Sequence, residues 1–253
     1  MTFDLVVATV DRVDELDRLL RSLERQTHAD FRVLVADQNE DRRVADVLAR
    51  HPSLRTERVA APRGLSRARN AALPYLQADA VAFPDDDCVY PDDLLERVAA
   101  RLEELDGVTG REEWWTATAA TITRDNLWNR AISFTIFLRR DVVERVGPFD
   151  ERLGLPASSG EEIDYLIRAL DGGARIDYDP SLVVGHPRKP VDLASVGARD
   201  GASIGYILRK HDYRARVVAR MLVRPAVGAL VHPRRAGFHL GTLRGRVRGY
   251  RTS

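Results

Sequence analysis

Three consecutive aspartates, Asp85, Asp86 and Asp87, directly follow the apolar run "AVAFP" and stand where a strand would end. Alternate residues of an extended chain point to the same side, so two of these carboxylates can face a common point. Hard divalent cations such as Mg²⁺ and Mn²⁺ take oxygen ligands of this kind, usually together with phosphate oxygens. The pattern indicates a metal and phosphate site. The alternative is an acidic loop in solvent, which the apolar residues on both sides disfavour.

A pair of glutamates opens the segment "SSGEEIDYLIRAL" at 158–170. On a helix its Ile and Leu residues form one apolar stripe, with Glu161 on the opposite side and Glu162 at the border. The positive end of the helix dipole favours the ionised carboxylate that a general base needs. Glu162 is therefore a candidate base and Glu161 its rival. The alternative is that both simply suit a helix N-terminus.

Two further sets of residues are chemically suited to a metal and phosphate site. His186 ends the apolar segment "LVVGHP", and neutral imidazole is a common metal ligand, although a lone histidine also serves structural roles. Arg63, Arg67 and Arg69 surround the start of an expected helix in "APRGLSRARNAAL". A helix N-terminus with nearby guanidinium groups suits a phosphate. The alternative for these arginines is an exposed basic face.

The elements that must position these groups alternate along the first 105 residues. Apolar runs predict strands over 4–10, 31–37, 54–60 and 80–83, and helical periodicity predicts helices between and after them. This order predicts an α/β fold with a mostly parallel central sheet flanked by helices. Ligands of such sheets bind at the carboxyl ends of the strands. Thr9, Asp37 and the three aspartates all fall at such ends.

The second part of the chain has a different pattern. Strands are expected over 114–122 and 132–140, a turn-rich connector over 146–154 and a helix over 160–173. The segment 174–187 predicts two short strands divided by Asp179 and Pro180. The residues after 190 have a helical and basic pattern.

Composition places the chain among ordinary globular proteins, with 253 residues, 44% hydrophobic and 30% charged. Its apolar segments are too short, or too interrupted by Arg, to span a bilayer, and we expect no signal peptide. A single cysteine, Cys88, excludes an internal disulfide and agrees with a reducing cytoplasm. We therefore expect a cytoplasmic protein.

The charge is unevenly distributed. Residues 199–253 carry 13 Lys and Arg against two Asp, a net charge of +11, whereas the rest carry 26 basic and 36 acidic residues. Because Val, Leu, Met and Phe are mixed with the arginines, this tail suits the surface of an anionic membrane. The alternative is a helical lid whose arginines pair with the acidic body. No recognition motif accompanies the charge, so we expect no nucleic-acid partner.

Taken together and in order, these segments resemble the GT-A-fold glycosyltransferases of the family-two type, over residues 4–188. Thr9, Asp37, "GLSRARN" and "FPDDDC" match the donor half of that family, and "VGPFDERLG", "SGEEIDYLIRAL" and "VVGHP" match the acceptor half. The resemblance implies a Rossmann-like GT-A catalytic domain over 1–190. Its nucleotide-sugar half would be 1–105 and its acceptor half 106–190, followed by a basic, mainly helical segment over 191–253.

The resemblance also implies roles at the donor site. Thr9 and Asp37 would hold the nucleobase, with Asp37 accepting a hydrogen bond from it. Arg67, or else Arg69 or Arg63, would lie by the nucleotide. Asp85 would approach the ribose, and Asp86 would share this task or the metal.

The remaining implied roles concern catalysis. Asp87 and His186 would hold a divalent cation, Mn²⁺ or Mg²⁺, and Glu162 would be the catalytic base. The implied reaction moves a sugar from a nucleotide-diphosphate sugar to an acceptor hydroxyl with inversion. Asp37 favours a uridine donor, and the acceptor would be a saccharide or a lipid-linked sugar in bacterial polysaccharide or glycolipid assembly, at the inner face of the membrane.

Two departures from the family pattern affect the site. The first strand runs into "ATVDR" where the family has a Pro-Thr-Tyr-Asn-like turn, so contacts near Val10 and Asp11 differ. Glu162 stands where the family usually has Asp, and the extra methylene moves the acceptor hydroxyl away from the helix.

The same residues support two rival functions less well. A sugar-phosphate nucleotidyltransferase would carry a Gly-rich, Lys-containing phosphate loop near the first strand, and "VVATVDRVDEL" contains neither Gly nor Lys. A catalytically inactive donor-binding scaffold would have lost its acidic residues, whereas Asp85, Asp87, Glu162 and His186 are all present.

Overall fold

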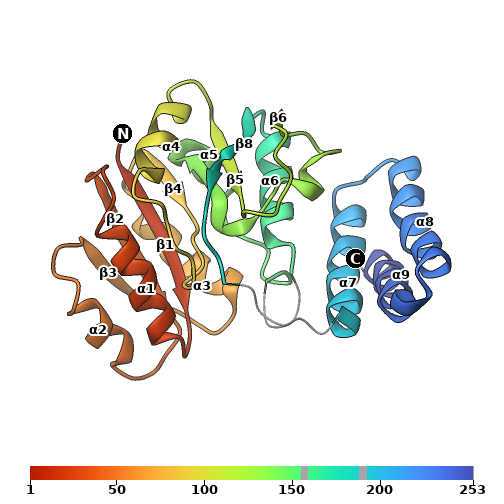
Figure 1. Cartoon of the computed structure of the whole chain (residues 1–253), viewed down its shortest axis with the longest axis horizontal. Helices are drawn as coiled ribbons and strands as arrows, with labels where there is room; N and C mark the ends of the chain where they lie inside the picture. The colour runs from red at the N-terminus through yellow and green to blue at the C-terminus, as the bar shows by residue number, and fades with distance from the viewer. Residues whose placement is uncertain (155–158, 188–192, 253) are drawn as a thin grey trace. The chain divides into compact units, whose positions relative to one another are not determined.

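The computed structural model describes residues 1–154, 159–187 and 193–252, and the chain divides into two compact units (Figure 1). The first unit consists of Met1–Phe149 and Tyr165–Pro187, and the second of Asp150–Asp164 and Arg188–Ser253. The boundary expected between residues 190 and 191 lies outside the described residues.

A mixed sheet forms the centre of the first unit, and within the described residues it has eight strands in the order β3-β2-β1-β4-β7-β5-β8-β6. The strands are β1 (Phe3–Thr9), β2 (Phe31–Asp37), β3 (Thr56–Ala60), β4 (Ala80–Ala82), β5 (Gly107–Arg111), β6 (Ala120–Thr121), β7 (Ile136–Arg139) and β8 (Ile176–Val183). β3, β2, β1 and β4 are mutually parallel, β8 is parallel to β5, and β7 and β6 run antiparallel to their neighbours. The predicted α/β class with a mostly parallel sheet is confirmed.

Helices cover the sheet of the first unit, and their apolar stripes explain why. The helices that lie at least partly in this unit are α1 (Val13–Leu23), α2 (Arg43–Leu48), α3 (Leu65–Ala72), α4 (Leu94–Leu102), α5 (Arg140–Val146) and α6 (Glu161–Asp171). Leu16, Leu20 and Leu23 of α1 recur at helical spacing and join one buried cluster with α2, α4 and the alternate residues of β1 and β2. α3 contacts β1, β2 and β3.

β1 and β4 are buried along their whole length, as strands of a sheet covered on both faces must be. Every residue of β1 is buried, and β1 pairs with β2 in a register that sets Thr9 beside Asp37. The two residues predicted to hold a nucleobase are therefore neighbours at the carboxyl edge of the sheet.

Three expectations for the second part of the chain need correction. Of the strand expected over 114–122, only Ala120–Thr121 forms, and the strand over 132–140 shortens to β7 because a 3₁₀ turn at Ser133–Thr135 precedes it. Asp179 and Pro180 do not divide β8. The register between β5 and β8 shifts between Thr109 and Arg111, so the proline occupies an irregularity where its missing N–H breaks no ladder.

The second unit contains a helical bundle, as the basic tail predicted. It is formed by α7 (Leu193–Lys210), α8 (Ala215–Val231) and α9 (Ala236–Arg251), with a 3₁₀ turn at Pro233–Arg235. α7 and α9 pack backbone to backbone. A Cβ added at Gly249 of α9 would lie only 1.9 Å from the carbonyl oxygen of Ala202 in α7, so this contact requires glycine. Among the residues described, no helix has both the length and the apolar character needed to cross a membrane.

Candidate active site

The aspartate loop begins where β4 ends and runs beside the end of β1. Asp85 pairs in parallel with Ala8, so it extends the sheet beyond Ala82. A turn follows, in which the backbone N–H of Cys88 donates to the carbonyl oxygen of Asp85 at 3.1 Å. The three carboxylates therefore lie at the carboxyl edge of the sheet, as predicted.

Asp86 is buried and fastens this loop to the end of β1. Its Oδ2 accepts a hydrogen bond from the hydroxyl of Thr9 at 2.8 Å, and its Oδ1 lies 2.6 Å from the guanidinium of Arg12. Burial raises the pKa of Asp86 to about 6, although Arg12 and Thr9 act in the opposite direction. Thr9 and Asp86 were both predicted at the donor site, and the structure brings their side chains together.

Arg12 is a residue of this site that the sequence analysis missed. Its guanidinium also donates to Oδ2 of Asp87, so two buried carboxylates share one cation. Burial lowers the pKa of Arg12, but the charge of Asp86 and the hydrogen bond to Asp87 outweigh burial and raise it. The signal was available in the sequence, since Arg12 lies in the loop that leaves the carboxyl end of the first strand.

Backbone pairing holds His186 opposite Asp87. Val89 and Gly185 exchange two hydrogen bonds of 2.8 and 2.9 Å, and His186 Nε2 then lies 3.1 Å from Asp87 Oδ1. The imidazole stacks on the ring of Phe134, with centroids 4.7 Å apart and planes within 4° of parallel. The ring is therefore held by its neighbours in a fixed orientation toward the aspartates.

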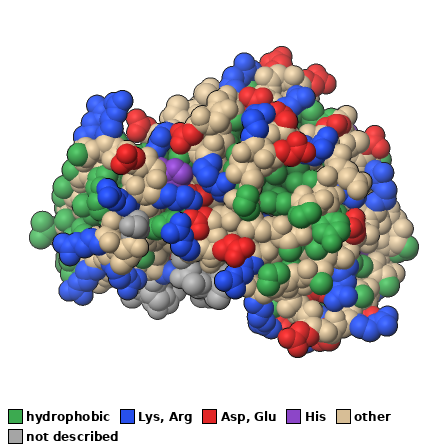
Figure 2. All heavy atoms as spheres, turned by 180° about the vertical axis from the view of Figure 1, so that it is seen from behind, with side chains coloured by type: hydrophobic (Ala, Val, Ile, Leu, Met, Phe, Trp, Pro, Cys, Tyr) green, Lys and Arg blue, Asp and Glu red, His purple; other side chains and the backbone are tan. Residues whose placement is uncertain are grey.

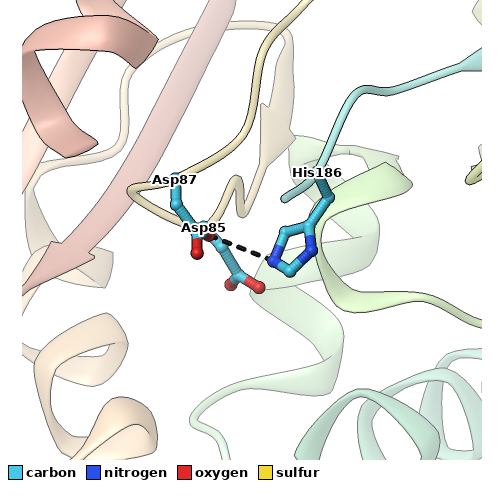
Figure 3. A group of neighbouring side chains, drawn as sticks. All are labelled: Asp85, Asp87 and His186. Atoms are coloured by element: carbon cyan, nitrogen blue, oxygen red, sulfur yellow. Dashed lines mark ion pairs between the residues drawn. The ribbon is translucent and has the colours of Figure 1, made fainter. Parts of the chain in front are cut away.

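Asp85, Asp87 and His186 together present three potential metal ligands, as Figure 3 shows. One oxygen from each carboxylate and one imidazole nitrogen all lie within 4.8 Å of one another. Mg²⁺ and Mn²⁺ accept carboxylate oxygens, and imidazole is an accepted additional ligand. The donor set therefore fits the predicted divalent cation.

Glu112, which follows β5, supports this arrangement and was not predicted. Its Oε1 lies 3.5 Å from His186 Nδ1, so a carboxylate faces the ring nitrogen that is remote from Asp87. Such a partner orients a ligating histidine and leaves its other nitrogen for the metal. Burial lowers the pKa of His186, but the hydrogen bond and charge of Asp87, helped by Asp85 and Glu112, outweigh burial and raise it.

Of the three arginines predicted near the nucleotide, Arg69 is the one shown in contact with the aspartates. It is buried, and its Nη2 lies 3.1 Å from Asp85 Oδ1 and 2.6 Å from the hydroxyl of Ser133. Its guanidinium also lies 5.8 Å and 5.5 Å from the ring centroids of Phe83 and Phe149. Arg69 therefore supplies a fixed positive charge to Asp85.

The other two arginines are exposed at the start of α3 and in the loop before it. Arg67 lies on the exposed side of α3, and Nη2 of Arg63 lies 3.4 Å from Oδ2 of Asp11. The role of Arg67 beside the donor stays a prediction.

Asp37 is buried at the end of β2 and already has two protein partners. Arg58 Nε donates to its Oδ2 at 2.6 Å, and the backbone and side-chain amides of Asn39 donate to its Oδ1 at 2.9 and 2.7 Å. A carboxylate has about four lone-pair positions, so a further hydrogen bond from a nucleobase can be added. That role of Asp37 also stays a prediction.

The two glutamates of α6 belong to the second unit. Glu161, on the side of the helix opposite the apolar stripe, is nevertheless only 4% exposed, while Glu162 is half-buried. The apolar stripe failed as a guide because the first turn of α6 is buried on more than its apolar side: Asp164 is fully buried as well. The greater exposure of Glu162 suits a base that must meet an acceptor, and its role stays a prediction.

Polar contacts join the first turn of α6 to the end of α7 within the second unit. Asp164 Oδ1 lies 2.6 Å from Lys210 Nζ and 2.7 Å from His211 Nε2. Asp150 Oδ2 accepts from the hydroxyl of Tyr206 at 2.6 Å and lies 2.9 Å from the same lysine amine. The segment that carries both glutamates is therefore fastened to the C-terminal helices.

The sheet, with its acidic site at the carboxyl edge, defines a GT-A-type glycosyltransferase. The chain matches the family model described as glycosyl transferase family 2 over residues 4–146, and it belongs to that family. It is also similar to a curated glycosyltransferase, AglE of Haloferax volcanii, with 24% identity over 208 residues that make up 74% of this chain and 67% of the relative. The predicted family, fold and enzyme class are confirmed.

Solved structures share the fold at low sequence identity. Mannosyltransferase PcManGT from Pyrobaculum calidifontis, in complex with GDP-Man and Mn²⁺, has a TM-score of 0.72 at 16% identity, with 98% of this chain and 86% of that chain covered. Residues 1–349 of TarS from S. aureus, in complex with UDP, give 0.66 at 18% identity over 100% and 92%. A further TarS structure gives 0.66 at 17% identity, and there the chain spans only 55% of the length of its match.

Proposed function

We propose that the chain is a metal-dependent, inverting glycosyltransferase that moves a sugar from a nucleotide-diphosphate sugar to an acceptor hydroxyl. The carrying observation is the set of donor atoms on Asp85, Asp87 and His186, within 4.8 Å of one another at the carboxyl edge of the sheet. Membership of glycosyl transferase family 2 supplies the reaction class, and the donor set supplies the reason for metal dependence.

The residues of the site have distinct tasks in this proposal. Asp87 and His186 would hold Mn²⁺ or Mg²⁺, which when bound neutralises the charge that develops on a departing diphosphate. Glu162 would take the proton from the acceptor hydroxyl as the oxygen attacks the anomeric carbon. Attack from the face opposite the diphosphate inverts the anomeric configuration.

The donor contacts fall on the first unit. Asp37 and Thr9, paired in register, would receive the nucleobase, with Asp85 at the ribose, Asp86 beside it and Arg67 at the phosphates. The lone-pair position that remains on Asp37 suits an imide N–H, which is why we propose a UDP-linked sugar. Two observations on relatives support a nucleotide donor: TarS has been solved with UDP and UDP-GlcNAc, and PcManGT with GDP-Man and Mn²⁺.

For the acceptor we propose a saccharide or a lipid-linked sugar of bacterial polysaccharide or glycolipid assembly. The enzyme would work in the cytoplasm, in peripheral contact with the inner face of the membrane through residues 199–253. The support is the net charge of +11 on that segment.

A donor assay with paired variants tests the proposal. Purified protein is incubated with UDP- and GDP-sugars, with Mn²⁺ or with EDTA, and the release of nucleoside diphosphate is measured. Asp87→Asn is expected to abolish metal-dependent release, while the exposed Asp93→Asn is expected to behave as wild type. With an acceptor, Glu162→Gln is expected to reduce transfer by a factor of about 10²–10⁴ and to keep donor affinity, whereas Glu161→Gln has a small effect.

Each other outcome has a definite reading. Release of pyrophosphate instead of nucleoside diphosphate would identify a nucleotidyltransferase. Donor binding without any turnover would identify an inactive scaffold. Undiminished release in EDTA would refute metal dependence, and near wild-type transfer by Glu162→Gln would remove it as the base.

A further inference from the structure

One face of α8 is exposed along its whole length, and its residues are basic toward the N-terminus and mainly apolar toward the C-terminus. Arg216, Arg220 and Arg224 follow one another at spacings of four residues from the start of α8 to just past its middle, and all three are exposed. From its middle to its C-terminus α8 carries Val223, Val227 and Leu230 on the same face at spacings of four and three, with Val231 at the edge of that face. These residues and their exposed fractions are Val223 (57%), Val227 (49%), Leu230 (83%) and Val231 (63%).

The surface continues from Val231 into the connection to α9. Between the two helices lies an open hollow of about 660 Å³ lined by Val231, His232, Pro233, Arg234, Arg235 and His239. The surface therefore has an exposed apolar centre with guanidinium groups on the α8 side and on the connecting turn. We call Val223, Val227, Leu230 and Val231, together with Arg216, Arg220, Arg224, Arg234 and Arg235, the α8–α9 face.

The arginines near this face are not isolated on the surface. Figure 2 shows, on its left side, blue Lys and Arg side chains gathered with green apolar side chains among them on the C-terminal helices. Residues 199–253 contain only two acidic side chains, Asp200 and Asp212, and neither lies on α8 or α9. The positive charge of these two helices is therefore not balanced by acidic residues of their own.

We propose that the α8–α9 face docks on an anionic phospholipid membrane, with the apolar residues in the interfacial region and the arginines at the phosphates. Aliphatic side chains exposed at the end of a helical hairpin bury apolar area by entering a deformable lipid surface. Long arginine side chains keep their guanidinium groups at headgroup level while their stems lie in the apolar layer. The hollow that contains Arg234 and Arg235 gives a lipid phosphate a place between cations.

Charge argues against the other plausible occupant, a second copy of the chain. In a symmetric pair each basic rim would face its own copy, and like charges across an interface are repulsive. The apolar centre also contains no Trp, Tyr or Phe, the aromatic anchors that protein interfaces prefer. An anionic bilayer satisfies both halves of the face.

Vesicle flotation of the full chain tests this inference, which deepens the membrane contact of the proposed function. Vesicles of phosphatidylcholine are compared with vesicles that also contain phosphatidylglycerol. The test variant is Leu230→Ser with Val231→Ser, and its matched control is Tyr75→Ser, because Tyr75 is an exposed apolar residue of the first unit. A second pair compares Arg234→Gln with Arg235→Gln against Arg18→Gln with Arg55→Gln, two exposed arginines of the first unit.

The full chain is expected to float with the anionic vesicles and not with the neutral ones. The apolar variant is expected to bind at least about tenfold more weakly, which corresponds to about 1.4 kcal/mol. The α8–α9 arginine variant is expected to lose a similar factor, and both controls to stay within about twofold of wild type. Raising the salt to about 1 M, which shortens the screening length to about 3 Å, should release the protein.

Three results would overturn the proposal: no flotation of the full chain, wild-type flotation of the apolar variant, or a dimer in analytical ultracentrifugation that the apolar variant converts to monomer. The assay measures binding and not sugar transfer. A wrong donor assignment therefore leaves these expectations unchanged, and a failure here leaves the donor assay unchanged.

Discussion

Replacing Asp86 by Asn should change how the stability of the metal-free protein depends on pH. Burial raises the pKa of this carboxyl from 3.8 to about 6. The folded state therefore holds the proton more tightly than the unfolded chain. Ionisation of Asp86 destabilises the fold as the pH rises from about 4 to about 6, and the penalty is then constant, at about 3 kcal/mol.

About 2 kcal/mol of this penalty develops between about pH 4.5 and about pH 7.5. Urea unfolding in EDTA at these two values, followed by tryptophan fluorescence, measures it in the relevant unit, because Trp114, Trp115 and Trp128 all lie in the first unit. The difference in unfolding free energy between the two values should shift by about 2 kcal/mol in Asp86→Asn, with the variant relatively more stable at the higher pH. The exposed Asp93→Asn should follow wild type.

His186 contributes in the same direction without obscuring the result. Its raised pKa means that its stabilisation is present below about pH 6.5 and lost as the pH rises through the folded-state value. The groups that raise it are Asp87, Asp85 and Glu112, so this contribution is common to wild type and Asp86→Asn. If the variant keeps the wild-type pH dependence, the raised pKa of Asp86 and the burial argument behind it are wrong.

Three further predictions use other parts of the structure. Arg69→Met should lower the unfolding free energy by about 3 kcal/mol, because it leaves a carboxylate without its buried partner, while the exposed Arg18→Met, which loses only a surface ion pair with Glu15 at 3.8 Å, should change it by less than about 1 kcal/mol in the same urea assay. Gly249→Ala should lower the melting temperature of the helical signal in circular dichroism, since its Cβ would lie 1.9 Å from a backbone oxygen, whereas Gly237→Ala, with nothing within 4 Å, should raise it slightly. Mn²⁺ at about 100 times its Kd should stabilise the protein by about 2.7 kcal/mol at neutral pH and less in acid, in a thermal-shift assay, and His186→Ala should reduce the effect.

The sequence predicted the nucleotide half of the fold because each of its signals is local. The strands ending at Thr9 and Asp37 are short, mainly apolar runs, and the leucines of the helix between them recur at helical spacings of three and four. The position of the aspartates followed from the rule that sites lie at strand ends. The strand over 114–122 failed because its alternation of Thr and Ala is polar enough to stay outside the ladder over most of its length.

The partners of the predicted residues could not be read from the sequence. Arg12 lies 74 residues from Asp86, and Glu112 lies 74 residues from His186, so only the folded sheet makes them neighbours. The burial of Glu161 had a similar cause, because helical periodicity describes one helix face and not the surfaces that cover its first turn. Local patterns located the reactive groups, and tertiary contacts determined their electrostatic environment.

The division of the chain has a consequence for protein engineering. Residues 150–164, which carry Glu161 and Glu162, are fastened through Asp164 and Asp150 to the end of α7, and α7 in turn packs against α9. A chimaera that took both 150–164 and 193–252 from a homologue would exchange these glutamates and the exposed helical face together. The recipient would keep its own aspartate loop and histidine, so substrate preference at the two ends of the reaction could be recombined independently.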